Sequence, residues 1–464
     1  MRNAVAVMAV MVASCAGPAA TPVTAPADRS SSTTTSVPAV VFLPATYAEV
    51  PCSITPPVTF AVLCESFEDI DEFHVDGPDP AALAAAAALG VGSAALGTDG
   101  SGQVTDFSCV TPHESFGVVC DAIARRAMDG PIDMGVMVTA AVRGMFRYGL
   151  DPFSSYVPGA EMEADFEPSG LVVELGMVVS ARDEAGAACG PIGGSCAFEV
   201  LSAFEFGPAS SAGLAVGDRI VAIDGWPTEG LSAAEATVLL GGAPGTGTVV
   251  AIDRDGTIVE RSLTREDIRT APSEIDFLDD GIVYMRLNDF SQQAAVDLGF
   301  FLQLPEVEAA SGMVLDLRDN PGGLVLAAQG VASQFLDGGV VMVERGKSYV
   351  EEIPVIDGGL ATDRLRLVVL VNRASASAAE IVAAVLQERG RAVVVGETTF
   401  GKNLVQSYQT ARDGGMIGIT IARWETPEGL DIGIRGLEPD VVVTADADTE
   451  ADEVLDAGLA VLSG

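Results

Sequence analysis

The C-terminal part of this 464-residue chain alternates short apolar runs with helix-like segments. In chain order they are residues 312–318 (strand), 324–336 (helix), 365–372 (strand), 377–389 (helix) and 392–397 (strand). Further strands are expected between Val405 and Trp424. Strands that alternate with helices are typical of α/β folds. We therefore expect residues 267–448 to form an α/β core.

Residues 167–266 have the pattern of a small β-rich domain. Runs rich in β-branched residues, separated by glycine-rich turns, occur at residues 171–179, 198–202, 219–223, 247–252 and 257–263. Such runs predict strands, and one helical segment at residues 232–240 interrupts them. This pattern alone fits any small β-barrel and indicates no function.

The regions that flank these two are predicted to be helical in part. Within residues 46–166, an alanine-rich helix is expected at 81–96 and an amphipathic helix at 134–148, with Arg143 and Arg147 on its polar side. A turn is expected at residues 151–156. Residues 449–464 are predicted to form a short acidic helix.

The N-terminus has the pattern of a secretory signal. A positive start at Arg2 precedes ten apolar residues, 4–13, which are too few to span a bilayer. The following Val-Ala-Ser-Cys at residues 12–15 resembles a lipoprotein signal, so residues 1–14 would be removed and Cys15 would carry a lipid anchor. The alternative is an ordinary signal that is cleaved nearby. Residues 15–45 are rich in Ser, Thr and Pro, which predicts a disordered linker.

The remaining six cysteines support export. Their order along the chain suggests three local pairs, Cys52 with Cys64, Cys109 with Cys120, and Cys189 with Cys196. Sequence alone allows 15 connectivities, so this pairing rests on proximity. Disulfides would place the chain in an oxidising compartment, whereas six buried free thiols are the alternative. The cysteine and histidine spacing does not fit a zinc site, and we expect no metal and no cofactor.

Charge and composition exclude several functions. The net charge is 25 − 65 = −40, which argues against nucleic-acid binding because phosphate recognition needs a basic surface. The chain has only two lysines, Lys347 and Lys402, and only two histidines, His74 and His113. We expect both histidines to be structural or surface residues, because neither accompanies a nucleophile motif of the Gly-x-Ser-x-Gly type.

Lys402 is a candidate general base. A lysine can serve as a base when burial lowers its pKa, and Phe400, Leu404 and Val405 could desolvate it. In an extended chain, residues 402 and 406 share a face, so Gln406 could hold the Lys402 amine. Composition alone fits an ordinary surface lysine equally well. Lys347 is expected in a turn.

Ser377 is a candidate nucleophile because it begins a predicted helix just after a strand. A helix N-terminus offers N–H groups to a developing oxyanion. However, Ser377 and Glu380 also have the spacing of a capping box, which needs no chemistry. Gly322 and Gly323, in a turn after the strand at 312–318, could offer further N–H donors. A plain strand–turn–helix connection is the alternative for that turn.

Several of these segments, taken in order, resemble the carboxyl-terminal processing peptidases, also called tail-specific proteases. The matching segments are residues 315–323 (Leu-Asp-Leu-Arg-Asp-Asn-Pro-Gly-Gly), 369–377 (Val-Leu-Val-Asn-Arg-Ala-Ser-Ala-Ser), 395–402 (Val-Gly-Glu-Thr-Thr-Phe-Gly-Lys), 421–427 and 436–440. Residues 151–156 resemble the segment before that family's PDZ domain. Residues 167–266 resemble the PDZ domain itself. The resemblance covers roughly residues 135–460.

The resemblance implies a serine endopeptidase with a crotonase-like α/β core. Ser377 would be the nucleophile, Lys402 the general base, and Gln406 the residue that orients Lys402. Backbone groups around Gly322, Gly323 and Ala378 would form the oxyanion hole. The PDZ domain would bind substrate C-termini through Gly170, Leu171 and Val172, but the second glycine that is usual in this loop is missing here, because the loop reads Ser-Gly-Leu-Val.

The expected protein is therefore an exported enzyme of the cell envelope or exterior, held to the membrane only through Cys15. Its partners would be proteins or peptides with free C-termini, and no nucleic acid. The alternatives are a non-catalytic PDZ lipoprotein that binds peptides and a structural envelope protein. The sequence does not give the substrate or the oligomeric state.

Overall fold

The computed structural model describes residues 48–52, 58–94, 108–162, 171–204, 207–266, 268, 271–361, 364–433, 435–444 and 451–463. The predicted signal peptide, the linker at residues 15–45, Cys15 and Gly170 lie outside these ranges.

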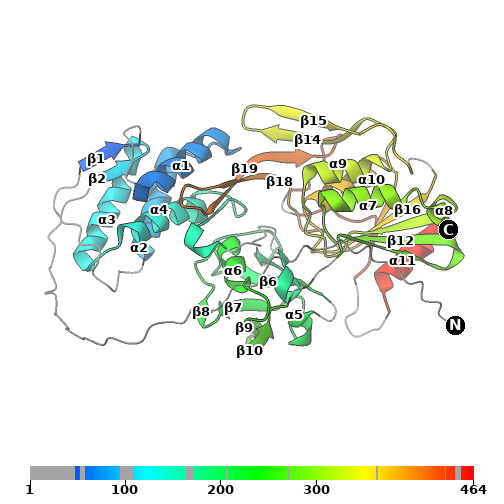
Figure 1. Ribbon diagram of the computed structural model, residues 1–464, viewed down its shortest axis with the longest axis horizontal. Coiled ribbons are helices and arrows are strands. Elements are labelled where there is room, and N and C mark those ends of the chain that lie inside the picture. The colour runs from blue at the N-terminus through cyan, green and yellow to red at the C-terminus, as the bar shows by residue number, and fades with distance from the viewer. Residues whose placement is uncertain are drawn as a thin grey trace, which may run out of the picture. The chain divides into compact units, whose positions relative to one another are not determined.

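A six-stranded sheet forms the centre of the predicted α/β core (Figure 1). Its strands, in spatial order, are β11 (Ser273–Phe277), β12 (Ile282–Leu287), β13 (Gly312–Asp316), β16 (Arg366–Val371), β17 (Val393–Gly396) and β20 (Val441–Val442). All neighbouring pairs are parallel except β11 with β12. The inner strands are continuous apolar runs because parallel sheets are covered on both faces.

Helices cover both faces of this sheet. The helices of this region are α7 (Gln292–Phe301), α8 (Pro305–Glu308), α9 (Val325–Ser333), α10 (Ala378–Glu388) and α11 (Glu453–Ser463). A short turn, η4 (Asp279–Gly281), precedes β12. Met313 and Leu315 of β13 pack into the core that contains α7, α9 and α10. Val314, between them, faces a smaller core with Val454 and Leu462 of α11. This alternation follows from the two-residue period of a strand.

A second, antiparallel sheet carries the segment after Lys402. Its strands are β15 (Val350–Pro354), β14 (Val340–Gly346), β19 (Met416–Glu425), β18 (Leu404–Thr410) and β3 (Ser155–Val157), the last of which pairs with β19. The pairing of β18 with β19 shifts by one residue between Val405 and Gln406. Such a bulge changes where the following side chains point.

Residues 171–264 form a third sheet, here called the middle sheet. Its elements are β4 (Leu171–Val172), η3 (Val173–Leu175), β5 (Met177–Arg182), β6 (Ala197–Ala203), α5 (Pro208–Ser211), β7 (Arg219–Ile223), β8 (Trp226–Pro227), α6 (Ala233–Leu240), β9 (Gly247–Arg254) and β10 (Thr257–Thr264). The strand expected at residues 171–179 is interrupted by η3, because the chain turns back so that Leu171 and Val172 pair with Val178 and Met177.

The described part of the N-terminal region is largely helical, whereas the sequence predicted helices in only part of it. It contains β1 (Ala48–Pro51), α1 (Val58–Phe73), α2 (Pro80–Ser93), β2 (Ser108–Thr111), η1 (Glu114–Phe116), α3 (Gly117–Asp129), α4 (Met134–Gly149) and η2 (Gly159–Glu161). Helices α2 and α4 approach closely at Gly90 and Gly144. A Cβ at Gly90 would lie 2.0 Å from the carbonyl oxygen of Ala140, so this crossing needs glycine.

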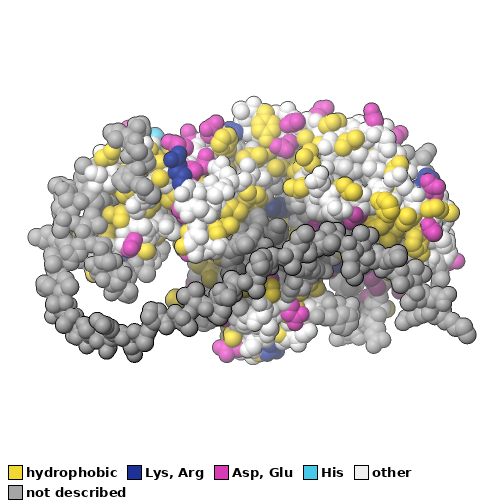
Figure 2. Space-filling view, in the orientation of Figure 1, with side chains coloured by type: hydrophobic (Ala, Val, Ile, Leu, Met, Phe, Trp, Pro, Cys, Tyr) yellow, Lys and Arg dark blue, Asp and Glu magenta, His cyan; other side chains and the backbone are white. Residues whose placement is uncertain are grey.

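Three disulfides link Cys52 to Cys64, Cys109 to Cys120, and Cys189 to Cys196. This is the pairing that proximity in the sequence suggested. Acidic side chains are scattered over the face shown in Figure 2, where basic side chains are sparse, as the net charge requires. No helix within the described ranges is long and apolar enough to cross a membrane.

Candidate active site

Ser377 lies between strand β16 and helix α10, at the first turn of the helix. Its backbone has φ 53° and ψ −113°, a left-handed conformation that costs a residue other than glycine about 1–3 kcal/mol. The strain is held by contacts on either side: the N–H of Ala376 donates to the carbonyl oxygen of Asn320 (2.9 Å) and that of Ile381 to the carbonyl oxygen of Ser377 (2.9 Å). Strain of this kind concentrates at functional sites.

The neighbouring Ser375 has a structural role. It is fully buried, and its hydroxyl donates to the carbonyl oxygen of Leu317 (2.7 Å) and accepts from the N–H of Asn372 (3.0 Å). Its own carbonyl oxygen accepts from the N–H of Phe400 (2.9 Å). Ser375 therefore ties the Ser377 loop to strand β13 and to the Lys402 loop.

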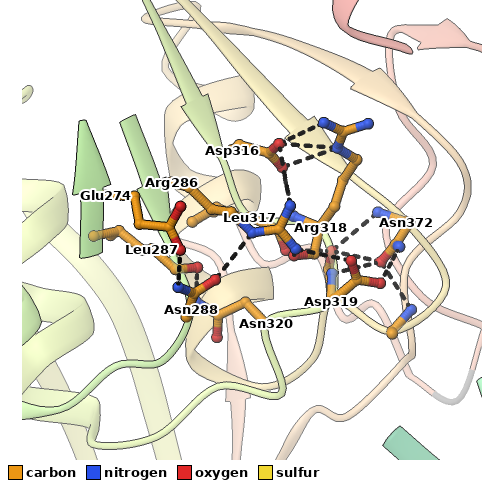
Figure 3. Close-up of polar contacts among 12 residues, drawn as sticks. Glu274, Arg286, Leu287, Asn288, Asp316, Leu317, Arg318, Asp319, Asn320 and Asn372 are labelled. Atoms are coloured by element: carbon orange, nitrogen blue, oxygen red, sulfur yellow. Dashed lines mark hydrogen bonds and ion pairs between the residues drawn. The ribbon is translucent and has the colours of Figure 1, made fainter. Parts of the chain in front are cut away.

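The turn after β13 is joined to the Ser377 loop by a pair of reciprocal hydrogen bonds (Figure 3). The N–H of Asp319 donates to Asn372 Oδ1 (3.0 Å), and Asn372 Nδ2 donates to Asp319 Oδ1 (2.7 Å). At the base of the turn, the buried Asp316 accepts from Arg318, which also reaches Asp452 ahead of α11. These contacts join the turn to the Ser377 loop and to the segment before α11.

Gly322 provides the close approach that the Ser377 loop needs. A Cβ at Gly322 would lie 2.8 Å from Ser377 Cβ and 3.0 Å from the backbone nitrogen of Ala378. The N–H of Gly322 is already used, because it donates to Asn320 Oδ1 (2.8 Å). Gly322 is therefore placed to admit the Ser377 loop rather than to donate to an oxyanion.

Gly323 and Ala378 keep their backbone N–H groups available. Neither N–H donates to a partner among the described residues. Ala378 is the first residue of α10, where an N–H group has no partner within the helix. Gly322 is bonded to Gly323 in the chain and lies against the backbone nitrogen of Ala378. It therefore lies between the two donors. Of the three residues predicted for an oxyanion hole, these two can donate.

Glu380 connects the Ser377 loop to the Lys402 loop. Its carboxylate is fully buried and accepts from the N–H of Ser377 (2.8 Å), the N–H of Lys402 (2.9 Å), the N–H of Gly401 (2.6 Å) and the hydroxyl of Thr399 (2.5 Å). Burial raises the pKa of Glu380, and the four donors oppose that rise. The sequence indicated Glu380 only as a partner for a helix cap. Its bonds to residues 399–402 could not be seen from the helix alone.

Lys402 is placed as a candidate base requires. Burial lowers the pKa of Lys402 to about 8, and the nearby carboxylates of Asp151 and Glu380 limit the fall. Its amine lies 5.3 Å from the centre of the Phe153 ring. No hydrogen bond or ion pair holds the amine within the described part of the chain. Lys347, in contrast, is an exposed residue whose amine donates to the carbonyl oxygen of Asp71.

Gln406 does not hold the Lys402 amine in this structure, which corrects the expectation from an extended chain. Lys402 precedes β18, and the bulge in the pairing with β19 places Gln406 opposite Thr420. Gln406 Nε2 donates to Thr420 Oγ1 (3.3 Å) instead. The sequence could not reveal the bulge because it depends on pairing between two strands.

A pocket beside Lys402 is shared with the middle sheet. Its lining includes Phe153, Phe400 and Lys402 on one side, and Ser180, Cys189 and Thr237 on the other. Arg182 of β5 makes the contact, because its Nη1 donates to the carbonyl oxygen of Phe400 (2.9 Å) and its guanidinium lies 3.6 Å from the centre of the Phe400 ring. Burial lowers the pKa of Arg182 to about 10.

The known proteins that this chain resembles are peptidases. The family model described as peptidase family S41 matches residues 281–443. The carboxyl-terminal-processing protease of Synechocystis sp. is 39% identical over 279 residues, which are 57% of this chain and 65% of the relative. The carboxy-terminal-processing protease of Bartonella bacilliformis is 32% identical over 339 residues, 71% of this chain and 74% of the relative. The corresponding protease of Bacillus subtilis is 31% identical over 309 residues, 66% of this chain and 63% of the relative.

The chain spans slightly less than two thirds of the length of the Synechocystis and Bacillus relatives. Among solved structures, the photosystem II D1 C-terminal processing protease matches with a TM-score of 0.62 and 24% identity, over 86% of this chain and 97% of the other. At that identity the match shows a shared fold.

Proposed function

This chain belongs to peptidase family S41 and to its carboxyl-terminal-processing proteases, and on that premise we propose that it is a serine endopeptidase of the Ser/Lys type. One observation carries the proposal. A strained serine at a helix N-terminus and a half-buried lysine donate their backbone N–H groups to the same carboxylate oxygen, Glu380 Oε2.

In the proposed reaction, Ser377 Oγ attacks the carbonyl carbon of the scissile peptide bond. Neutral Lys402 takes the serine proton and gives it to the leaving amine, which leaves an acyl-enzyme. A water molecule then attacks the acyl carbon while Lys402 takes one of its protons, and Lys402 gives that proton to Ser377 Oγ as the ester bond breaks and the new C-terminal carboxyl group leaves. The N–H groups of Gly323 and Ala378 would stabilise the oxyanion in both steps.

We assign residues 167–266 to a PDZ domain and residues 267–448 to a crotonase-like core. The middle sheet with helix α6 supports the first assignment, and its contact through Arg182 would place a captured C-terminus beside Lys402. A tail would add as a strand near Leu171 and Val172. The substrates are proposed to be proteins with free C-termini, outside the cytoplasm, where disulfides persist.

The proposed function is tested by removing each reacting group. Ser377→Ala and Lys402→Ala are each expected to abolish cleavage of a tail-bearing model protein, such as an unfolded casein, whereas Lys347→Ala is expected to keep it. A fluorophosphonate probe should label Ser377 in the unaltered chain and fail to label it in Lys402→Ala. Full cleavage by either of the first two variants would rule out the Ser/Lys mechanism. Tail binding without cleavage by the unaltered chain would favour a peptide-binding protein.

A further inference from the structure

The carboxylate of Asp151, whose charge acts on Lys402, accepts hydrogen bonds from three separate parts of the chain. The donors are His74 Nε2 (3.0 Å), Ser154 Oγ (2.7 Å), Thr420 Oγ1 (3.0 Å), the N–H of Phe153 (2.9 Å) and the N–H of Ser154 (3.1 Å). These partners come from the end of α1, from the segment before β3 and from β19. The serine peptidase mechanism proposed above assigns no role to Asp151 or His74.

The protons in this cluster can be placed from its hydrogen bonds. His74 Nδ1 accepts from the N–H of Asp76 (3.2 Å), so the ring proton is on Nε2 and points at Asp151. The Ser154 and Thr420 hydroxyls also donate to the carboxylate. Asp151 therefore meets only donors and is ionised. Burial alone would raise the pKa of Asp151, but the bonds from His74, Ser154 and Phe153 bring it below its usual value.

Asp151 contacts Phe153, whose ring lies near the candidate base, and Thr420, which binds Gln406. It accepts from the N–H of Phe153, whose ring lies 5.3 Å from Lys402 Nζ. It also accepts from the Thr420 hydroxyl, and that hydroxyl in turn accepts from Gln406 Nε2 (3.3 Å). Gln406 is thus connected to Phe153, beside Lys402, through the hydrogen bonds of Thr420 and Asp151.

The side chain of His74 is 2% exposed and that of Asp151 is 16% exposed, so water screens this pair weakly. Other charged groups face the cluster. Asp76 and Arg423 form an exposed ion pair (2.7 Å), and Glu380 also acts on Lys402 through its charge. Asp151 is the stronger of the two carboxylates that favour the charged form of Lys402.

We propose that Asp151, oriented by His74, is a positioning residue for the catalytic lysine: it holds Phe153 and Thr420 in place and acts on the Lys402 amine through its negative charge. This inference rests on the proposed role of Lys402. It predicts two effects that a purely structural residue would not combine. Loss of the charge lets Lys402 lose its proton at lower pH, and loss of the bonds disorders the base.

The test is Asp151→Asn in the full chain, which keeps the shape and removes the charge. Two rates are measured against pH: casein cleavage and the inactivation of Ser377 by a fluorophosphonate. The acidic limb of both profiles is expected to move about one pH unit lower, and the plateau is expected to fall about tenfold. An acidic limb that stays in place would overturn the proposed effect of the Asp151 charge, and an unchanged plateau would overturn the proposed effect of its hydrogen bonds.

His74 is tested separately in case Asp151→Asn does not fold. His74→Gln keeps an N–H that can donate to Asp151 and is expected to retain more than half of the plateau rate. His74→Leu removes that donor and is expected to lower the plateau several-fold. His113→Gln is the matched control, because the contacts of His113 are with the short turn η1, which it caps, and with Phe67 of α1, and it should leave both profiles unchanged. Equal rates for His74→Leu and the unaltered chain would contradict the role of His74.

The outcome is separable from a failure of the proposed function. If Ser377→Ala or Lys402→Ala remains active, the Ser/Lys mechanism fails, whatever Asp151→Asn shows. If both are inactive and Asp151→Asn behaves like the unaltered chain, only the role of Asp151 fails.

Discussion

Ser377 and Lys402, which lie 25 positions apart in the sequence, donate their backbone N–H groups to a single oxygen, Glu380 Oε2, at 2.8 and 2.9 Å. The relative position of the two loops is therefore set by a buried carboxylate.

Glu380→Gln is expected to lower kcat/KM for casein about 100-fold, because either orientation of the amide turns an NH2 group toward two backbone or hydroxyl donors. A buried donor left without an acceptor costs about 1–3 kcal/mol, so the melting temperature should fall as well. Glu352→Gln, on the exposed strand β15, is the control. Near-normal activity in Glu380→Gln would show that the two loops are held by other contacts.

The pH dependence of cleavage should follow the ionisation of Lys402. Only the neutral amine can accept the Ser377 proton, and burial lowers the pKa of Lys402 to about 8. The value of kcat/KM should therefore rise with pH through about 8 and be about 100-fold below its plateau at pH 6. Lys347→Ala should show the same profile. A profile that is flat between pH 6 and 9 would exclude Lys402 as the base.

Lys402→Met is expected to be inactive but more stable than the unaltered chain at pH 7. In the folded protein the pKa of Lys402 is about 8, whereas its usual value is 10.5, so the unfolded chain binds the proton more readily. The stability of the unaltered chain should therefore increase from pH 8 to about 10.5, and the advantage of Lys402→Met should shrink over that window. Thermal unfolding of both chains at several pH values measures this difference in stability. Lys347→Met should show no such dependence.

Gly322→Ala is expected to reduce activity more than 100-fold, because the added Cβ would lie 2.7 Å from the carbonyl oxygen of Ala376 and 2.8 Å from Ser377 Cβ. Gly358 offers a matched control. It has φ +96°, close to the φ +100° of Gly322, but a Cβ there would meet nothing within 4 Å. Gly358→Ala therefore has the backbone cost without the clash. Equal activities of the two variants would show that only backbone strain matters at Gly322.

Arg182→Ala is expected to separate cleavage of proteins from reactivity of the serine. The substitution removes the hydrogen bond and the ring contact to Phe400, which join the middle sheet to the loop that carries Lys402. Casein cleavage should fall about tenfold, while fluorophosphonate labelling of Ser377 should change less than threefold. A parallel loss of both rates would indicate that Arg182 instead supports the Lys402 loop itself.

Much of the core could be predicted because its signals are local. Strands β13, β16 and β17 are continuous apolar runs, and Ser377 and Lys402 stand out by position and composition. The failures are non-local. The expected Gln406–Lys402 contact depended on the pairing of β18 with β19, and the bulge there cannot be read from residues 402–406 alone. His74 and Asp151 are separated by 77 positions, so their bond has no sequence signature.

The residues that build the site are spread along most of the chain. His74, Asp151, Gly322, Ser377 and Lys402 come from five segments, and Trp424, near the end of β19, donates to the carbonyl oxygen of Lys402 (3.0 Å). A fragment of the chain that ends before β19 lacks Thr420 and Trp424 and therefore cannot form all the contacts of the site. If the proposed mechanism holds, we expect the peptidase to be inactive while its chain is being made, so that it would not cleave its own unfinished chain.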